Sequence, residues 1–220
     1  VPLREYLGWS ATQKACHKLF RVGVNFHQEV SLPVDPYFLG VLLGDGCLRN
    51  RIAVTTDDPE IRACVEENAR RWELSVSIEA EGTTSATYHL LTGRIGGRVN
   101  PLREALKGLG VFGTDSESKF IPLQYKVSSA ENRLRILAGL IDTDGSLNCG
   151  GYDFVSKSQA LANDVAFVAR SVGLAAYVRP CAKAQTGVEG RYFRVFISGC
   201  VSRIPVRLSR KKAGPREQAK

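Results

Sequence analysis

Two acidic residues occupy matching positions in two similar stretches of the sequence. Asp45 lies near the end of the stretch F-L-G-V-L-L-G-D-G at 38–46, and Asp144 near the end of L-A-G-L-I-D-T-D-G at 137–145. Each stretch is typical of an apolar helix that ends at its acid. A carboxylate at a helix C-terminus opposes the helix dipole, at a cost of a few tenths to about 1 kcal/mol. The same unfavourable choice in both repeats indicates that the two carboxylates serve a purpose.

Small residues in both stretches predict that the two helices pack against each other. Gly40 and Gly139 recur at matching positions, although an interior glycine costs a helix about 1 kcal/mol relative to alanine. Gly44 and Thr143 follow four residues later, on the same helix face. Small residues at this spacing let two helix backbones approach closely. Parallel packing related by a pseudo-twofold axis would bring the two acids together at one end.

A pair of neighbouring carboxylates is suited to binding a hard cation. The two charges repel and raise one pKa unless cations lie between them. Mg²⁺ prefers oxygen ligands and retains several waters, so two carboxylates together with phosphate oxygens suit it. The pattern therefore predicts metal-assisted hydrolysis of a phosphodiester. Asp142 is a third acid nearby, but Leu43 is its counterpart in the first repeat, so we expect Asp142 to be a structural cap.

The segments after the two stretches are also alike. Each stretch is followed by a strand-like segment, an amphipathic helix, two alternating runs and a final helix or turn. In the first half, Asp58 suits the N-cap of the helix and Pro59 its first turn. The segments lie at 49–55, 58–72, 74–80, 86–92 and 101–109 in the first half, and at 152–156, 158–172, 176–181, 191–198 and 201–208 in the second.

This duplication predicts an α+β fold of two pseudo-symmetric αββαββα halves, each with a mostly antiparallel four-stranded sheet. We expect a first half at 31–112, a connecting segment at 113–129, a second half at 130–212, a lead-in at 1–30 and a tail at 213–220.

Composition favours an anionic partner. The chain has 30 Lys and Arg against 22 Asp and Glu, for a net charge of +8 and a pI near 9.3. Such an excess favours nucleic acid, although many basic proteins bind none. The densest basic cluster, at 207–212, is by itself typical of a solvated chain end.

The remaining composition places the chain among globular proteins of the cell interior. Six cysteines without a C-x-x-C pair argue against zinc and, with no secretory signal, predict reduced thiols in an intracellular protein. The three widely spaced histidines are expected to be structural or surface residues. No apolar run approaches the roughly 20 residues that cross a bilayer. Because the sequence starts at Val1 and lacks methionine, we expect it to be cut from a longer polypeptide.

The two stretches resemble the signature of the LAGLIDADG homing endonucleases, in the two-motif, single-chain form found inside inteins. Residues 137–145 differ from the family's nine-residue string only at Thr143, and the first copy keeps L-G-D-G. Within each motif of the family, the first of the two acids is dispensable and the second is catalytic. The resemblance therefore implies that Asp45 and Asp144 are catalytic and bind Mg²⁺ or Mn²⁺ together with Gly44 and Thr143.

A further match is the segment Lys119-Phe120-Ile121-Pro122, which is similar to a K-x-I-P segment of intein endonucleases. The resemblance implies that Lys119 is an active-site residue. A second active-site lysine of the family follows the last strand of the second half, where Lys211 and Lys212 both stand. We assign catalysis to Lys212 and a DNA contact to Lys211, with the reverse assignment left open.

By resemblance, the chain is a monomer that cuts both strands of a long, asymmetric DNA site and leaves short 3′ overhangs. Each sheet forms one side of a saddle over the major groove, and the lead-in joins an intein's splicing half, whose splicing residues are absent. The protein would act wherever its host protein and DNA reside. A binding module that no longer cuts DNA and an RNA maturase are the alternatives. The expected DNA contacts are Arg49, Arg51, Thr55, Arg179, Tyr192, Arg194 and Lys211.

Overall fold

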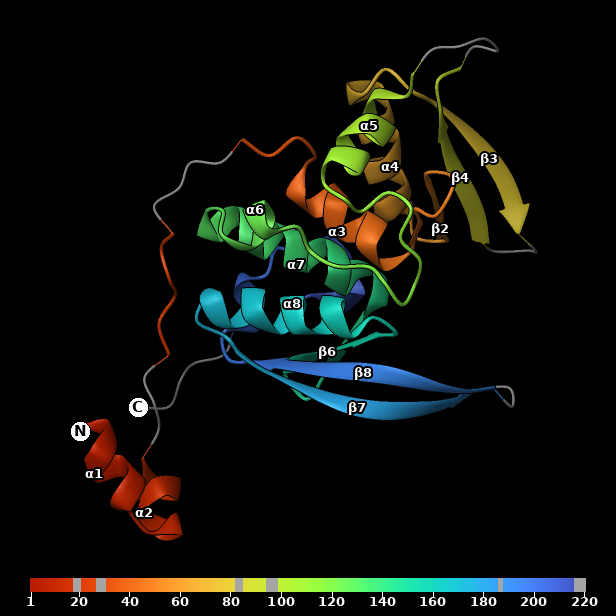
Figure 1. Cartoon of the computed structure of the whole chain (residues 1–220). Coiled ribbons are helices and arrows are strands. Elements are labelled where there is room, and N and C mark those ends of the chain that lie inside the picture. The colour runs from red at the N-terminus through yellow and green to blue at the C-terminus, as the bar shows by residue number, and fades with distance from the viewer. Residues whose placement is uncertain (18–20, 27–30, 82–84, 94–98, 186–187, 216–220) are drawn as a thin grey trace.

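The computed structural model describes residues 1–17, 21–26, 31–81, 85–93, 99–185 and 188–215 (Figure 1). His27 and parts of the expected lead-in and tail lie outside these ranges. The chain begins with two short helices, α1 (Leu3–Gly8) and α2 (Ala11–Cys16). Among the described residues, we find no helix long and apolar enough to cross a membrane.

The rest of the chain forms two halves with the same order of elements up to the second hairpin, as the repeat predicts; a helix then closes the first half and a 3₁₀ turn the second. The first half contains α3 (Pro36–Gly44), β1 (Gly46–Cys47), β2 (Ala53–Thr56), α4 (Pro59–Arg71), β3 (Ser75–Glu81), β4 (Ser85–Leu91) and α5 (Pro101–Gly108). The second contains α7 (Ala130–Asp144), β5 (Gly145–Asn148), β6 (Gly151–Ser156), α8 (Gln159–Ser171), β7 (Ala175–Gln185) and β8 (Val188–Ser198). A short helix, α6 (Leu123–Lys126), lies between the halves, and two 3₁₀ turns, η1 (Val201–Arg203) and η2 (Ser209–Lys211), follow β8.

Each half has its own four-stranded antiparallel sheet, with strand orders β1-β2-β4-β3 and β5-β6-β8-β7. The α+β prediction is confirmed. The hairpin of the second half is longer than that of the first, because β7 and β8 have 11 residues each and β3 and β4 have seven. Helices α7 and α8 lie over one face of the second sheet (Figure 1).

The first predicted strand of the first half is shorter than its sequence pattern indicated. A strand is predicted over residues 49–55, but the three residues at 49–51 are all polar and the ladder begins only at Ala53. Arg49 and Arg51 lie in the turn that joins β1 to β2, where both are exposed. Asp58 occupies the N-cap position of α4 as expected, but no capping hydrogen bond of its side chain is found in the described part of the chain.

Helices α3 and α7 lie side by side between the two sheets, and their backbones touch. A Cβ on Gly40 would lie 2.4 Å from the carbonyl oxygen of Ile136, and one on Gly139 would lie 2.1 Å from that of Tyr37. Neither position has room for a larger residue unless the helices separate. The close packing predicted from the paired glycines is therefore confirmed, and it fixes the two helix C-termini next to each other.

Candidate active site at the ends of the paired helices

The two acids of the repeat come together at the C-terminal ends of α3 and α7. Asp45 is the C-cap residue of α3, and Asp144 is the last residue of α7. Between them the helix ends are in contact, since a Cβ on Gly44 would lie 1.9 Å from Oγ1 of Thr143. Both acids are exposed at the surface.

The electrostatics of Asp45 differ from those of an ordinary surface carboxylate. Although the residue is solvent-accessible, the protein packed around it hinders its hydration, and this burial together with the charge of Asp144 raises the pKa of Asp45 to about 6. The charges of Lys119 and Lys211 oppose the increase. Two neighbouring carboxylates, of which Asp45 has a raised pKa, are a donor set that a divalent cation would stabilise, so these residues fit the expected metal.

Lys119 lies at the end of α3. Its side chain is buried, and Nζ donates to the carbonyl oxygens of Gly44 at 2.7 Å and of Gly46 at 2.8 Å. A cation at a helix C-terminus interacts favourably with the helix dipole. Burial lowers the pKa of Lys119, while the charges of Asp144 and Asp45 act in the opposite direction. The structure thus brings Lys119 to the two acids.

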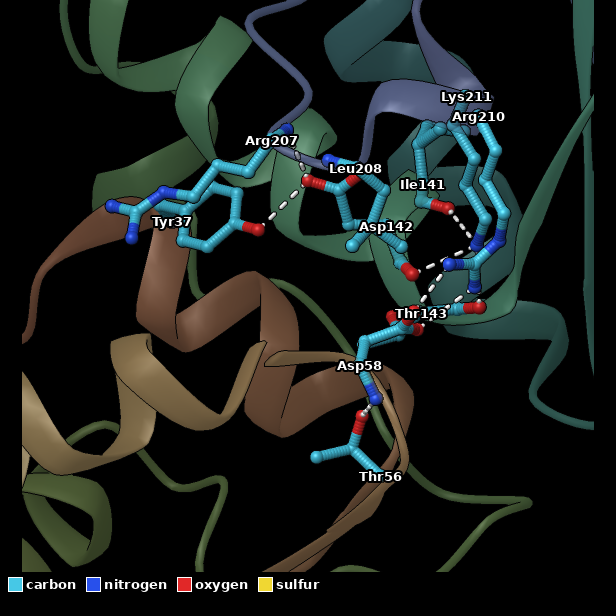
Figure 2. A network of polar contacts seen from close by, with 10 residues as sticks. All are labelled: Tyr37, Thr56, Asp58, Ile141, Asp142, Thr143, Arg207, Leu208, Arg210 and Lys211. Atoms are coloured by element: carbon cyan, nitrogen blue, oxygen red, sulfur yellow. Dashed lines mark hydrogen bonds and ion pairs between the residues drawn. The ribbon is translucent and has the colours of Figure 1, made fainter. Parts of the chain in front are cut away.

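Lys211, and not Lys212, holds the equivalent position on α7. Its Nζ donates to the carbonyl oxygens of Ile141, Asp142 and Thr143 at 2.9, 2.7 and 3.0 Å (Figure 2). Burial lowers the pKa of Lys211, and the neighbouring charge of Arg210 lowers it further. Lys212 is exposed. The interpretation of this basic cluster as a solvated chain end is wrong for Lys211, because the cluster folds back onto the end of α7.

Asp142 is the third acid, and it is 1 % exposed. It accepts hydrogen bonds from the Tyr37 hydroxyl at 2.7 Å and from the backbone N–H groups of Arg207 and Leu208 at 2.7 and 3.3 Å (Figure 2). The Arg207 guanidinium also lies 4.0 Å from the centre of the Tyr37 ring. Asp142 therefore has a structural role, but it binds the segment that leads to Lys211 instead of capping a helix.

An ion pair between the halves lies beside this network. Both guanidinium Nη atoms of Arg210 donate to the carboxylate of Asp58, with one contact of 2.8 Å (Figure 2). This hydrogen bonding lowers the pKa of Asp58. The sequence offered no local signal for the pair, because its partners lie at the start of α4 and after β8.

Of the DNA contacts expected in the second half, Arg179, Tyr192 and Arg194 lie on one face of its sheet, whereas Lys211 is buried at the end of α7. Arg179 and Arg194 are direct neighbours across β7 and β8, and Tyr192 pairs with Cys181 two residues further along. Phe193 and Val195 alternate with them and are buried, as predicted. Both arginines are exposed.

The corresponding face of the first sheet is less basic. Thr55 is half-buried, and its Oγ1 lies 2.6 Å from Oγ1 of Thr87. Further along the same face, His89 Nε2 lies 3.1 Å from the carboxylate of Glu79. The predicted basic residues of this half, Arg49 and Arg51, lie at the edge of the sheet and not on its strands.

Comparison with known proteins agrees with this geometry. Residues 131–204 match the family model described as a LAGLIDADG-like domain. A crystal structure of I-DmoI in complex with DNA and Mn is similar at 13% sequence identity, with 74% of this chain and 88% of that chain covered and a TM-score of 0.53. A crystal structure of an I-DmoI variant with its target DNA, in the presence of Mg, gives the same four values. The fold is that of a two-half LAGLIDADG protein.

A much longer protein is similar in sequence over a small part of its own length. The replicative DNA helicase DnaB of Mycobacterium intracellulare is 35% identical over 141 residues, which are 64% of this chain and 19% of the helicase sequence. The chain therefore spans about a fifth of that relative. The family match covers the second motif, and the structural matches support the fold of both halves. The roles of the individual residues stay predictions.

Proposed function

We propose that this chain is a site-specific endonuclease that hydrolyses a phosphodiester in each strand of double-stranded DNA and leaves short 3′ overhangs. The observation that carries the proposal is the arrangement at the helix ends. Two carboxylates, Asp45 and Asp144, meet where α3 and α7 touch, and each helix end holds one buried lysine, Lys119 or Lys211. One acid and one lysine for each half match a reaction carried out once on each strand.

The two acids are proposed to hold Mg²⁺ or Mn²⁺. Carboxylate oxygens are the donors such cations prefer. Burial and the charge of Asp144 raise the pKa of Asp45, and a bound cation would relieve the repulsion between the two acids. Gly44 and Thr143 offer carbonyl oxygens that already accept a hydrogen bond from a lysine, and each carbonyl keeps a second lone pair. A bound divalent cation would supply a water of lowered pKa and neutralise charge on the phosphate.

The lysines are proposed to act on the charge that develops during hydrolysis. An ammonium held at a fixed place in a partly buried site stabilises such charge more than a mobile surface lysine does. The carbonyl contacts of Lys119 and Lys211 hold each ammonium at a helix end and leave the acids exposed for the phosphate. We assign the second active-site role to Lys211 and leave Lys212 a surface position.

The sheet faces away from the helices are proposed to bind the two halves of a long, asymmetric site. Arg179 and Arg194 present two guanidinium groups on adjacent strands, and arginine bonds guanine bidentately in the major groove. Tyr192 lies on the same face, and Arg49, Arg51 and Thr55 would contact the other half-site. The different chemistry of the two faces suits a target without twofold symmetry and a single chain acting alone.

We further propose that the chain is the endonuclease part of an intein. The support is that a replicative helicase matches over only 19% of its length, whereas the same 141 residues are 64% of this chain. An inserted domain would produce such a pattern. Residues 1–30 would then be the connection to the splicing part.

The test is cleavage of DNA that spans the insertion point in a gene lacking the insert, with Mg²⁺ and with Asp144→Asn as the matched control. We expect double-strand breaks from the wild type and tight binding without breaks from the variant. If the wild type binds this DNA tightly and leaves both strands intact, the chain is a binding module and not an enzyme. Binding of structured RNA in preference to the duplex would favour a maturase.

A further inference from the structure

The segment that carries Lys119 serves the first half but is held by the second. The Lys119 side chain ends on α3, whereas the backbone of the segment lies against α8. The Ser158 hydroxyl donates to the carbonyl oxygen of Lys119 at 2.5 Å. Ser158 is the N-cap residue of α8, is 0 % exposed, and accepts from the backbone N–H of Leu161 at 3.1 Å.

A second contact fixes the same segment two residues later. The backbone N–H of Ile121 donates to the carboxylate of Asp164, on α8, at 2.9 Å. The other oxygen of Asp164 accepts from Nζ of Lys126 at 2.6 Å. Ile121 itself is 0 % exposed. Helix α8 therefore holds the backbone on both sides of Phe120, by one acceptor and one donor of the chain.

We propose that Ser158 and Asp164 are positioning residues for Lys119, so that a helix of the second half aligns the lysine that acts at the end of α3. This inference rests on the proposed function. The two contacts fix the segment's direction as well as its distance from the helix, because one binds a C=O and the other an N–H. A displacement of about 1 Å in an active site is enough to lower a rate by about 10²-fold.

The segment at Lys211 also contacts the opposite half, through Arg210 and Asp58, but the Lys211 carbonyl itself is held within the second half. The Tyr152 hydroxyl, on β6, donates to the carbonyl oxygen of Lys211 at 2.7 Å. Tyr152 is 0 % exposed and belongs to the same half as the α7 carbonyls that receive Lys211 Nζ. Each lysine thus has its own carbonyl held by a buried hydroxyl, and the two hydroxyls can be removed separately.

The experiment measures nicking of each strand on a duplex labelled at both 5′ ends. We expect Asp164→Ala to slow cleavage of one strand by at least about tenfold relative to the other. Tyr152→Phe should slow the opposite strand. Lys126→Ala is the matched control, because it removes the ion pair of Asp164 but keeps the Ile121 contact, and it should leave the ratio of the two rates unchanged.

An unaltered ratio in Asp164→Ala, or equal slowing of both strands, would overturn the proposal. Asp164→Asn keeps one oxygen acceptor, so it should change the ratio of the two rates by less than Asp164→Ala does. It replaces the alanine variant if that variant fails to fold. A wild type that cuts neither strand contradicts the proposed function instead. In that case, NMR of the lysine ammonium protons still decides the positioning role, by comparison of Asp164→Ala with the wild type. Faster proton exchange at Lys119 in the variant, with no change at Lys211, supports the role. An equal change at the two lysines opposes it.

Discussion

The two lysine sites are alike in outcome and different in construction. Lys119 donates to two carbonyls at the end of α3, and Lys211 donates to three at the end of α7. The segment of Lys119 is held by Ser158 and Asp164 of the second half. The segment of Lys211 is held by Tyr152 and Asp142 of the second half and, through Arg210, by Asp58 of the first. The two halves therefore place an ammonium at the same position with different sets of supporting contacts. The halves are not interchangeable, and substitutions should affect them unequally.

The largest effect is expected from removing either acid. Asp45→Asn and Asp144→Asn should each reduce double-strand cleavage by about 10³-fold or more, because a lost cation ligand removes several kcal/mol of transition-state stabilisation. DNA binding should persist, since neither residue is a cationic contact. Cleavage kinetics and binding titrations on one duplex measure both quantities. Loss of only one strand's cleavage in each variant would show that the acids act independently.

The lysines are expected to have the next largest effect. Lys119→Met and Lys211→Met should each slow cleavage of a different strand by about 10²–10³-fold, which is typical of removing one stabilising donor. Lys212→Met is the control and should cleave both strands as the wild type does. Rates are measured separately for each strand under single-turnover conditions. A defect in Lys212→Met with normal cleavage by Lys211→Met would reverse our assignment of the second lysine.

Asp142→Leu makes the second repeat resemble the first, in which Leu43 stands at the equivalent position. The substitution leaves the backbone N–H groups of Arg207 (partly buried) and Leu208 (buried) and the Tyr37 hydroxyl without their acceptor. We expect the free energy of unfolding to fall by about 3 kcal/mol, since each unsatisfied buried group costs about 1–3 kcal/mol. Urea unfolding measures the change. Tyr37→Phe removes a single hydrogen bond and should lower the free energy of unfolding by less. If the two variants lose equal amounts, the two backbone contacts of Asp142 do not contribute.

The two sheet faces give the fourth comparison. Arg194→Ala should lower discrimination for guanine at one position of the target by about 1–3 kcal/mol. Thr55→Val, on the less basic first sheet, should change discrimination by less. Binding is compared across a set of duplexes that differ by one base pair each. If both variants weaken binding uniformly for all sequences, these side chains contact the DNA backbone and do not determine specificity.

The smallest effect concerns pH. Because the folded pKa of Asp45 is about 6, above its ordinary value of 3.8, the folded protein binds more protons than the unfolded chain between these values. Asp45 therefore lowers the free energy of unfolding as pH rises through this range. Without divalent cations, Asp45→Asn should raise the Tm at pH 7.5 more than at pH 4. An identical rise at both pH values would contradict a raised pKa.

Local patterns in the sequence predicted much of the fold. The repeated order of elements and the paired glycines were informative because helix periodicity and close backbone approach depend on residues a few positions apart. The same patterns misplaced the start of the first strand, since the polar residues at 49–51 belong to the turn before the apolar run at 52–54. They also predicted too short a hairpin in the second half, where the two strands extend from Ala175 to Ser198.

The candidate site was predicted only in part. Asp45, Asp144 and Lys119 lie in recognisable motifs, and the structure brings them together. Neither Lys211 nor Lys212 lies in such a motif, and the choice between them depends on how the chain returns to the end of α7. Contacts such as Asp164 with Ile121 join residues that no spacing rule connects, so only the folded arrangement reveals them.

The glycine contact between α3 and α7 has a consequence for the DNA product. The close approach of Gly40 to Gly139, and of Gly44 to the Thr143 side chain, sets the separation of the two acids. In the proposed reaction, that separation determines how many base pairs lie between the two cuts. The length of the single-stranded ends would then depend directly on how closely the two helices pack.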